Sequence, residues 1–177
     1  MFSGRIEVTR APFFPWYNGV LRTSILPDWG VVFVSWGLDL CTGSGLFALF
    51  MSKYLNNIIA SDIDENAINI SLFNVSLNGL QSKIEIRNQN IKETVESSEK
   101  YDVITCNPPF IPVPKELNLP VYARGISNDG LGYYRLIIKN IEHMLTDNGI
   151  CYLVGEFAGD NLQPFFWDRI NRICKKV

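Results

Sequence analysis

The chain has 177 residues, of which 47% are hydrophobic and 19% charged, a composition typical of one globular domain and not of a disordered chain. Its net charge of −2 and its pI of about 5.4 argue against a strongly basic nucleic-acid-binding surface. Its apolar runs are too short to cross a bilayer. Its four cysteines lack the spacing of a metal site. We therefore expect a reduced, cytoplasmic protein without a membrane anchor or a bound metal.

Residues 1–30 form an N-terminal segment that differs in pattern from the rest of the chain. "RIEVTR" (5–10) alternates like a strand, and "NGVLRTS" (18–24) follows an Asn-Gly turn, so the segment could form a hairpin. Between them, "APFFPWYNG" (11–19) is aromatic and broken by prolines. We expect it to cover an exposed sheet edge, and the alternative is a lid over a site.

Residues 31–177 alternate between strand-like and helix-like segments. The sequence predicts strands at 31–40, 57–62, 83–88, 101–106 and 150–157, and helices at 46–55, 65–78, 132–145 and 165–175. Such alternation predicts an α/β fold, with a mostly parallel, Rossmann-like sheet flanked by helices. In these sheets ligands bind outside the carboxyl ends of the strands.

The first candidate motif is "DLCTGSG" (39–45), between the first strand and the first helix. Gly43 and Gly45 allow positive φ and the close approach of a ligand to the backbone. The loop has neither the third glycine of the dinucleotide fingerprint nor the Gly-Lys-Ser/Thr of a P-loop. Asp39 beside the loop could hold an ammonium group. A tight turn without a ligand is the structural alternative.

Polar residues after the next two strands extend this candidate site. Asp62 could accept hydrogen bonds from both hydroxyls of a ribose, Ile63 could pack on a purine, and Asn90 could pair with an adenine edge. The alternatives are a helix cap for Asp62 and an ordinary turn for Asn90. Together these residues describe a ligand with an amine, a ribose and a purine, and without a required phosphate.

The fourth predicted strand ends in "CNPPF" (106–110). Two prolines cannot continue a central strand, because neither donates to the hydrogen-bond ladder. The motif therefore falls at the same predicted edge as the glycine loop. A rigid surface turn is the alternative to a functional role.

In their order and spacing, "DLCTGSG", "ASDID" (60–64) and "CNPPF" resemble the class I S-adenosylmethionine-dependent methyltransferases. The nearest branch is that of the release-factor glutamine methyltransferases and the amino-methylating nucleic-acid enzymes, and the resemblance covers about residues 31–157. It implies S-adenosylmethionine as cofactor. The residues that it implies for cofactor binding are Asp39, Thr42, Gly43, Gly45, Asp62, Ile63, Asn90 and Asn107. Asn90 stands where many relatives have Asp.

The resemblance also implies an acceptor with a planar amide or amino nitrogen. The side-chain oxygen of Asn107 and the carbonyl of Pro108 would accept its two N–H groups, and Phe110 would stack on its flat group. The expected acceptor is a protein glutamine or a small molecule. The alternatives are an exocyclic amine of an RNA or DNA base, which the acidic composition disfavours, and a non-catalytic scaffold.

The family fold ends in an antiparallel hairpin beside the fifth strand, for which residues 158–177 leave too little room. We expect a methyltransferase domain over 31–177 that is shortened at its C-terminus, either as a shortened member or as a fragment. A bare fifth strand would promote aggregation. A cover is therefore expected from the N-terminal segment, the C-terminal helix or another subunit, including a second copy of the chain.

Overall fold

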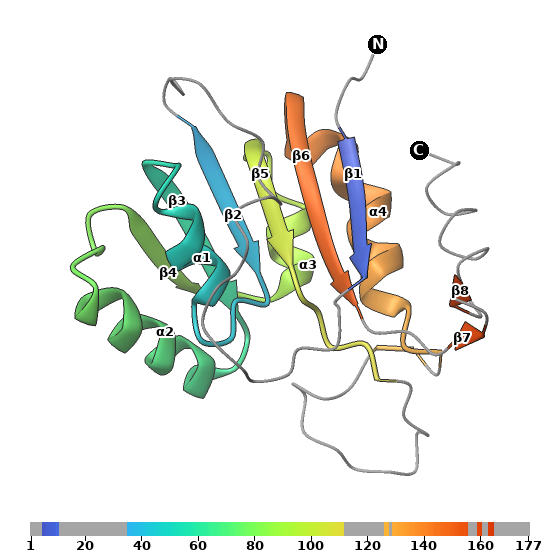
Figure 1. The fold of residues 1–177 in the computed structure, drawn as a ribbon, viewed down its shortest axis with the longest axis horizontal. Helices are drawn as coiled ribbons and strands as arrows, with labels where there is room; N and C mark the ends of the chain where they lie inside the picture. The colour runs from blue at the N-terminus through green and yellow to red at the C-terminus, as the bar shows by residue number, and fades with distance from the viewer. Residues whose placement is uncertain are drawn as a thin grey trace.

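The computed structural model describes residues 5–10, 35–111, 126–127, 129–155, 159–160 and 163–164. Its centre is a six-stranded sheet in which every neighbouring pair is parallel, in the order β1-β6-β5-β2-β3-β4 (Figure 1). The strands are β1 (Arg5–Arg10), β2 (Trp36–Leu40), β3 (Asn57–Asp62), β4 (Ile84–Asn88), β5 (Tyr101–Cys106) and β6 (Leu145–Gly155). The predicted α/β fold with a parallel sheet is confirmed.

Within the described ranges, four helices connect the strands: α1 (Leu46–Met51), α2 (Glu65–Leu77), α3 (Ile91–Val95) and α4 (Gly132–Met144). A separate antiparallel pair consists of β7 (Gly159–Asp160) and β8 (Gln163–Pro164). The sequence did not predict α3, because five residues are too few to show a helical period. The predicted helix at 165–175 lies outside the described residues.

Alternate residues of the strands pack on opposite faces of the sheet. On one face, residues such as Leu38, Ile104 and Leu153 pack with α3 and α4. On the other face, Ile58 and Val103 pack with α1 and α2. Both faces of the central strands are therefore buried, as the continuous apolar runs predict.

The edge beyond β6 is covered by β1. The two strands pair in parallel from Arg5 opposite Ile150 to Arg10 opposite Gly155. The sequence left the N-terminal segment, the C-terminal helix or another subunit open as the cover of this edge, and β1 of the N-terminal segment lies there. Residues 11–34 lie outside the described residues, and with them the predicted cover or lid at 11–19 and the possible second strand at 18–24.

Several predicted boundaries were wrong. Within the described residues β2 begins at Trp36 and not at 31, and α1 ends at Met51 and not at 55. Helix α4 ends at Met144, and β6 begins at Leu145, five residues before the predicted start. Leu145 fits the apolar face of the helix, but its extended backbone pairs with Tyr101 instead.

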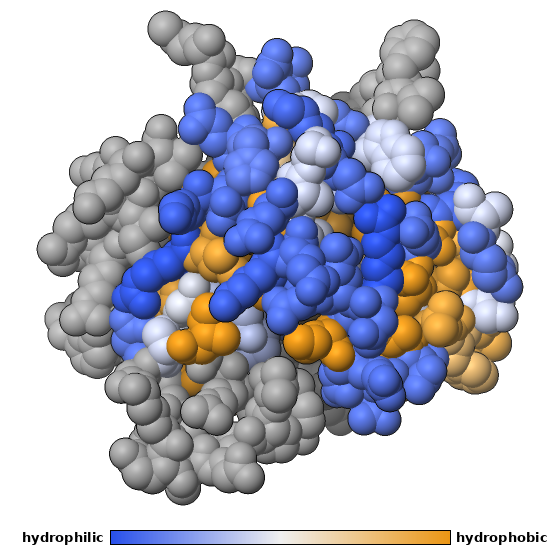
Figure 2. Space-filling model, turned by 180° about the vertical axis from the view of Figure 1, so that it is seen from behind, coloured by the Kyte–Doolittle hydropathy of each residue, from blue (hydrophilic) through white to orange (hydrophobic). Residues whose placement is uncertain are grey.

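The helical spacing of Ile68, Leu72 and Val75 predicts that these residues share the buried face of α2, and the structure differs in part. Val75 is 2% exposed as expected, but Leu72 is 49% exposed, and the fully buried position is Ser71. Ser71 is buried because its hydroxyl donates to a loop carbonyl of the site described below. Viewed from behind, the described surface is mostly hydrophilic and is interrupted by smaller apolar patches (Figure 2). Within the described part of the chain, none of the helices has the length and apolarity to span a membrane.

Candidate active site

The carboxyl ends of β2, β3, β4 and β5 lie at one edge of the sheet (Figure 1). The glycine loop follows β2, Asp62 ends β3, and Asn107 follows β5. Because β2 pairs with both β3 and β5, the glycine loop lies between Asp62 and Asn107. The structure thus brings the three predicted motifs to one edge.

The glycine loop has an unusual backbone. Its φ angles are positive at Cys41 (56°), Gly43 (57°) and Gly45 (82°). A residue with a side chain is strained in this region, by on the order of 1–3 kcal/mol, so Cys41 marks a constrained turn that the sequence did not reveal. A Cβ built on Gly43 would meet no atom of the described residues within 4 Å. The loop is therefore open at Gly43, where a ligand could approach the backbone closely.

Helix α2 holds this loop in place. The Ser71 hydroxyl donates to the carbonyl oxygen of Gly43 at 2.8 Å, and the Asn74 amide donates to that of Ser44 at 2.8 Å. The sequence analysis missed both residues. The sequence feature that could have revealed them is their spacing, because two polar side chains three positions apart lie side by side on one face of a helix.

Asp62 is half-buried and faces the loop from the end of β3. Its Oδ2 accepts from the Gly43 N–H at 2.9 Å, and its Oδ1 accepts from the Asp64 N–H at 3.0 Å. Asp62 was also a candidate for the cap of α2. The structure gives that role to Asp64, whose side chain accepts from the Asn66 N–H at the start of the helix. A carboxylate has about four acceptor positions, so Asp62 keeps capacity for ligand hydroxyls. Ile63 beside it is 49% exposed.

Asp39 does not have the predicted position. It is 0% exposed, so its carboxylate cannot touch the ammonium group of a ligand in this conformation. Its oxygens accept from the hydroxyls of Thr42 at 2.6 Å and Thr105 at 2.8 Å and from the Ala48 N–H at 3.1 Å. Asp39 is therefore a positioning residue that joins β2, β5, the loop and α1. Thr105 was missed, although a polar residue in a buried strand is a usable signal.

The Asp39 carboxyl predicts a pH effect. Burial raises its pKa from 3.8 to about 6, against the lowering effect of its hydrogen bonds. The folded state therefore binds the Asp39 proton more tightly than the unfolded chain does. The protonated carboxyl contributes its full stabilisation below pH 3.8, and this stabilisation is lost as the pH rises through about 6. This loss is at most about 3 kcal/mol.

Asp39→Asn removes this titration while keeping the side-chain shape. As the pH rises from 4 to 6, we expect the unfolding free energy of the wild type to fall relative to that of the variant, because only the wild type carries this titrating carboxyl. Urea unfolding at four pH values across this range measures it. A difference that stays constant with pH would contradict the raised pKa.

Asn107 directly follows the last residue of β5, and its side chain is exposed. Among the described residues, none forms a hydrogen bond with it. Pro108 is buried, and no described donor reaches its carbonyl oxygen. Phe110 is partly buried against the core cluster under α4. Two oxygen acceptors and a flat ring thus stand where the strand ends.

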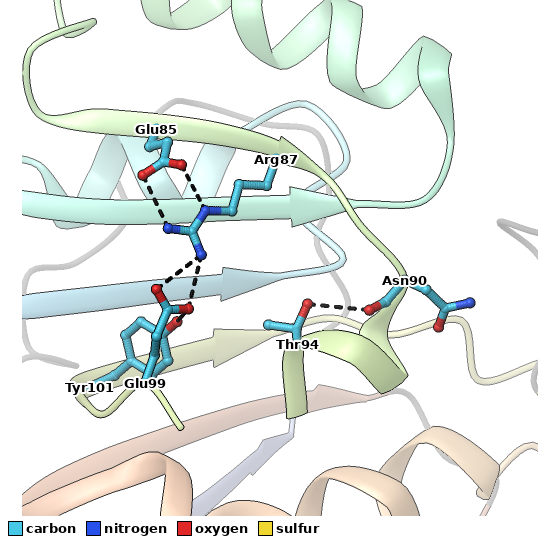
Figure 3. A network of polar contacts seen from close by, with 6 residues as sticks. All are labelled: Glu85, Arg87, Asn90, Thr94, Glu99 and Tyr101. Carbon is cyan, nitrogen blue, oxygen red and sulfur yellow. Dashed lines mark hydrogen bonds and ion pairs between the residues drawn. The ribbon is translucent and has the colours of Figure 1, made fainter. Parts of the chain in front are cut away.

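Asn90 lies at the end of the loop after β4 and caps α3. Its Oδ1 accepts from the Lys92 N–H at 3.0 Å, and its carbonyl oxygen accepts from Thr94 (Figure 3). An amide oxygen has two lone pairs, so Oδ1 keeps one acceptor position beside this cap, and the Nδ2 amide donates to no described residue. The side chain points away from a nearby ion-pair network in which Arg87 binds Glu85 and Glu99 (Figure 3).

Comparisons with known proteins agree with this geometry. A release factor glutamine methyltransferase of Clostridium acetobutylicum is 33% identical over 129 residues, which cover 66% of this chain and 45% of that protein. A ribosomal protein uL3 glutamine methyltransferase of Bordetella pertussis is 31% identical over 147 residues, which cover 74% of this chain and 49% of that protein. The chain thus spans about half the length of these curated relatives.

Among solved structures, the ribosomal protein L11 methylase from Lactobacillus delbrueckii subsp. bulgaricus matches with a TM-score of 0.56 at 18% identity. The match covers 82% of this chain and 60% of the other. At this identity the likeness shows the fold alone. The family model "Methyltransferase small domain" matches residues 31–128, more than half of the chain. The chain therefore belongs to the methyltransferase small-domain family and has the fold of the class I methyltransferases.

Proposed function

We propose that this protein transfers a methyl group from S-adenosylmethionine to the side-chain amide nitrogen of a protein glutamine. The observation that carries the proposal is the exposed Asn107 beside the Pro108 carbonyl, at the strand end next to the glycine loop. Family membership and the glutamine methyltransferases among the relatives support it. Since the acceptor is a protein made in the cytoplasm, we expect the enzyme to act there.

The residues at the edge suit this cofactor. The open backbone at Gly43 suits its methionine end, and the free acceptor capacity of Asp62 suits the two ribose hydroxyls. Exposed Ile63 offers an apolar contact for the adenine. Asn90 uses one lone pair of Oδ1 to cap α3, so the second lone pair could accept from the adenine amine and Nδ2 could donate to a ring nitrogen. When bound, S-adenosylmethionine supplies an electrophilic methyl group, whose carbon–sulfur bond breaks as the acceptor nitrogen bonds to the carbon.

The protein's own part in the reaction is to hold the acceptor amide. An amide nitrogen is a poor nucleophile, because its lone pair is delocalised onto the carbonyl. The Asn107 Oδ1 and the Pro108 carbonyl each accept one N–H of the acceptor and fix the direction of the lone pair. As the nitrogen becomes pyramidal and positive, these two hydrogen bonds strengthen and favour the transition state. The proton can leave to water afterwards, so no general base is required before transfer.

A transfer assay with tritiated methyl donor tests the proposal. The purified chain is incubated with a protein pool and, separately, with an RNA pool from the same cells, and the labelled products are digested. We expect label in protein, recovered as N5-methylglutamine. Label recovered as a methylated base would support the nucleic-acid alternative. Cofactor binding without any transfer would support a scaffold.

A further inference from the structure

Tyr133 lies in the first turn of α4, a helix that begins at the carboxyl edge of the sheet (Figure 1). It is half-buried. Together with Cys41 and Phe110, it packs against the core cluster that contains Cys106, the residue before Asn107. Tyr133 thus belongs to the same edge as the candidate site, although no motif in the sequence pointed to it.

The hydroxyl of Tyr133 differs from that of its neighbour in its hydrogen bonding. The Tyr134 hydroxyl is in the core and donates to the Val154 carbonyl at 2.8 Å. The Tyr133 hydroxyl forms no hydrogen bond with a described residue. A partly buried phenol usually has a hydrogen-bond partner. Because no described residue fills that role for Tyr133, a bound ligand could do so.

The surroundings of Tyr133 keep its hydroxyl protonated. Burial raises its pKa above the ordinary value of 10.0, and three nearby groups add to the effect: Cys41, Asp62 and Cys106. At neutral pH the group is therefore a hydrogen-bond donor. Its place at the site edge rests on packing, because Tyr133, Cys41 and Phe110 all lie against the cluster that contains Cys106.

We infer that the Tyr133 hydroxyl donates a hydrogen bond to the carbonyl oxygen of the acceptor carboxamide. A carboxamide presents two N–H donors and one carbonyl acceptor. In the proposed function, on which this inference rests, Asn107 and Pro108 bind the two donors. The carbonyl oxygen then needs a donor, and a buried polar group left unpaired is costly. Tyr133 supplies it and makes the site specific for a side-chain amide.

This hydrogen bond should assist binding more than chemistry. In the ground state the nitrogen lone pair is delocalised onto the carbonyl oxygen, which makes that oxygen a strong acceptor. As the nitrogen bonds to carbon, the delocalisation is lost and the oxygen accepts more weakly. Loss of the Tyr133 hydroxyl should therefore raise KM for the acceptor and leave kcat nearly unchanged.

The test compares Tyr133→Phe with Tyr134→Phe, a matched control that also removes one hydroxyl from α4. Each protein, saturated with S-adenosylhomocysteine, is titrated with N-acetylglutamine N-methylamide and followed by NMR of 13Cζ-labelled tyrosine. In the wild type the Tyr133 resonance should shift on titration, and N-acetylmethionine N-methylamide should not shift it. Tyr133→Phe should weaken binding of the glutamine compound about 5- to 10-fold. Its affinity for S-adenosylhomocysteine should stay within about twofold of wild type.

Acceptor binding that is unchanged in Tyr133→Phe would overturn the inference. So would a loss confined to S-adenosylhomocysteine, which would assign the hydroxyl to the cofactor, or an equal loss in Tyr134→Phe, which would indicate a structural effect. If the wild type itself fails to bind the glutamine compound, the proposed acceptor class fails. That outcome is distinct from failure at Tyr133 alone.

Discussion

Asn107→Ala is expected to abolish methyl transfer while leaving cofactor binding nearly intact. In the proposed function, the variant loses the Oδ1 acceptor for one N–H of the acceptor amide, an interaction that strengthens in the transition state. Removal of one such preorganised group typically lowers kcat about 10²- to 10³-fold. The affinity for S-adenosylhomocysteine, measured by calorimetry, should stay within about threefold of wild type. Stopped-time assays with tritiated donor give the transfer rate.

Asn56→Ala is the matched control for this variant. Asn56 is also an exposed asparagine next to a strand, but it precedes β3 at the opposite edge of the sheet. The Asn56→Ala variant should transfer methyl groups at the wild-type rate. If Asn107→Ala kept full activity, the assignment of a planar acceptor nitrogen would have to be abandoned.

Asp62→Ala should show the reverse pattern, with cofactor affinity lost first. In the proposed function, the variant loses two hydrogen bonds from ribose hydroxyls to a carboxylate, each worth about 1.5–3 kcal/mol when one partner is charged. We expect the dissociation constant for S-adenosylhomocysteine to rise at least about 10-fold. At saturating donor, the transfer rate should fall much less than in Asn107→Ala.

Asp62 also holds the Gly43 N–H, so its loss loosens the loop as well as the ribose contact. Ser71→Ala separates the two effects, because it removes the 2.8 Å bond to the Gly43 carbonyl and keeps the carboxylate. Ser71→Ala should lower thermal stability and leave affinity within a few-fold of wild type. Affinity losses of equal size in both variants would mean that loop order, and not a ribose contact, explains the role of Asp62.

Much of the fold follows from local patterns in the chain. Apolar strands such as 57–62 and 101–106 were predicted with their observed bounds, because both faces of each strand are buried. Boundaries failed where two structures compete for the same residue. Leu145 suits the apolar face of α4 as well as the first pair of β6, and only pairing with Tyr101 decides between them.

The site was predictable where a motif at the end of a strand carries it, and not where tertiary packing does. Asp62 and Asn107 could be placed from their positions alone. The burial of Asp39 could not be predicted, because it depends on packing with Thr105, which lies 66 residues away in the sequence. Tyr133 reaches the edge only through the packing of α4, which a local pattern does not encode.

The central claim is that the donor lies across the ends of β2, β3 and β5 with its reactive carbon facing Asn107. A crystal structure of the protein grown with S-adenosylhomocysteine tests it most directly. We expect the ribose hydroxyls on the Asp62 carboxylate, the methionine end over Gly43 and the sulfur directed toward Asn107. Ligand density elsewhere, or none at this edge in crystals that contain saturating ligand, would contradict the claim.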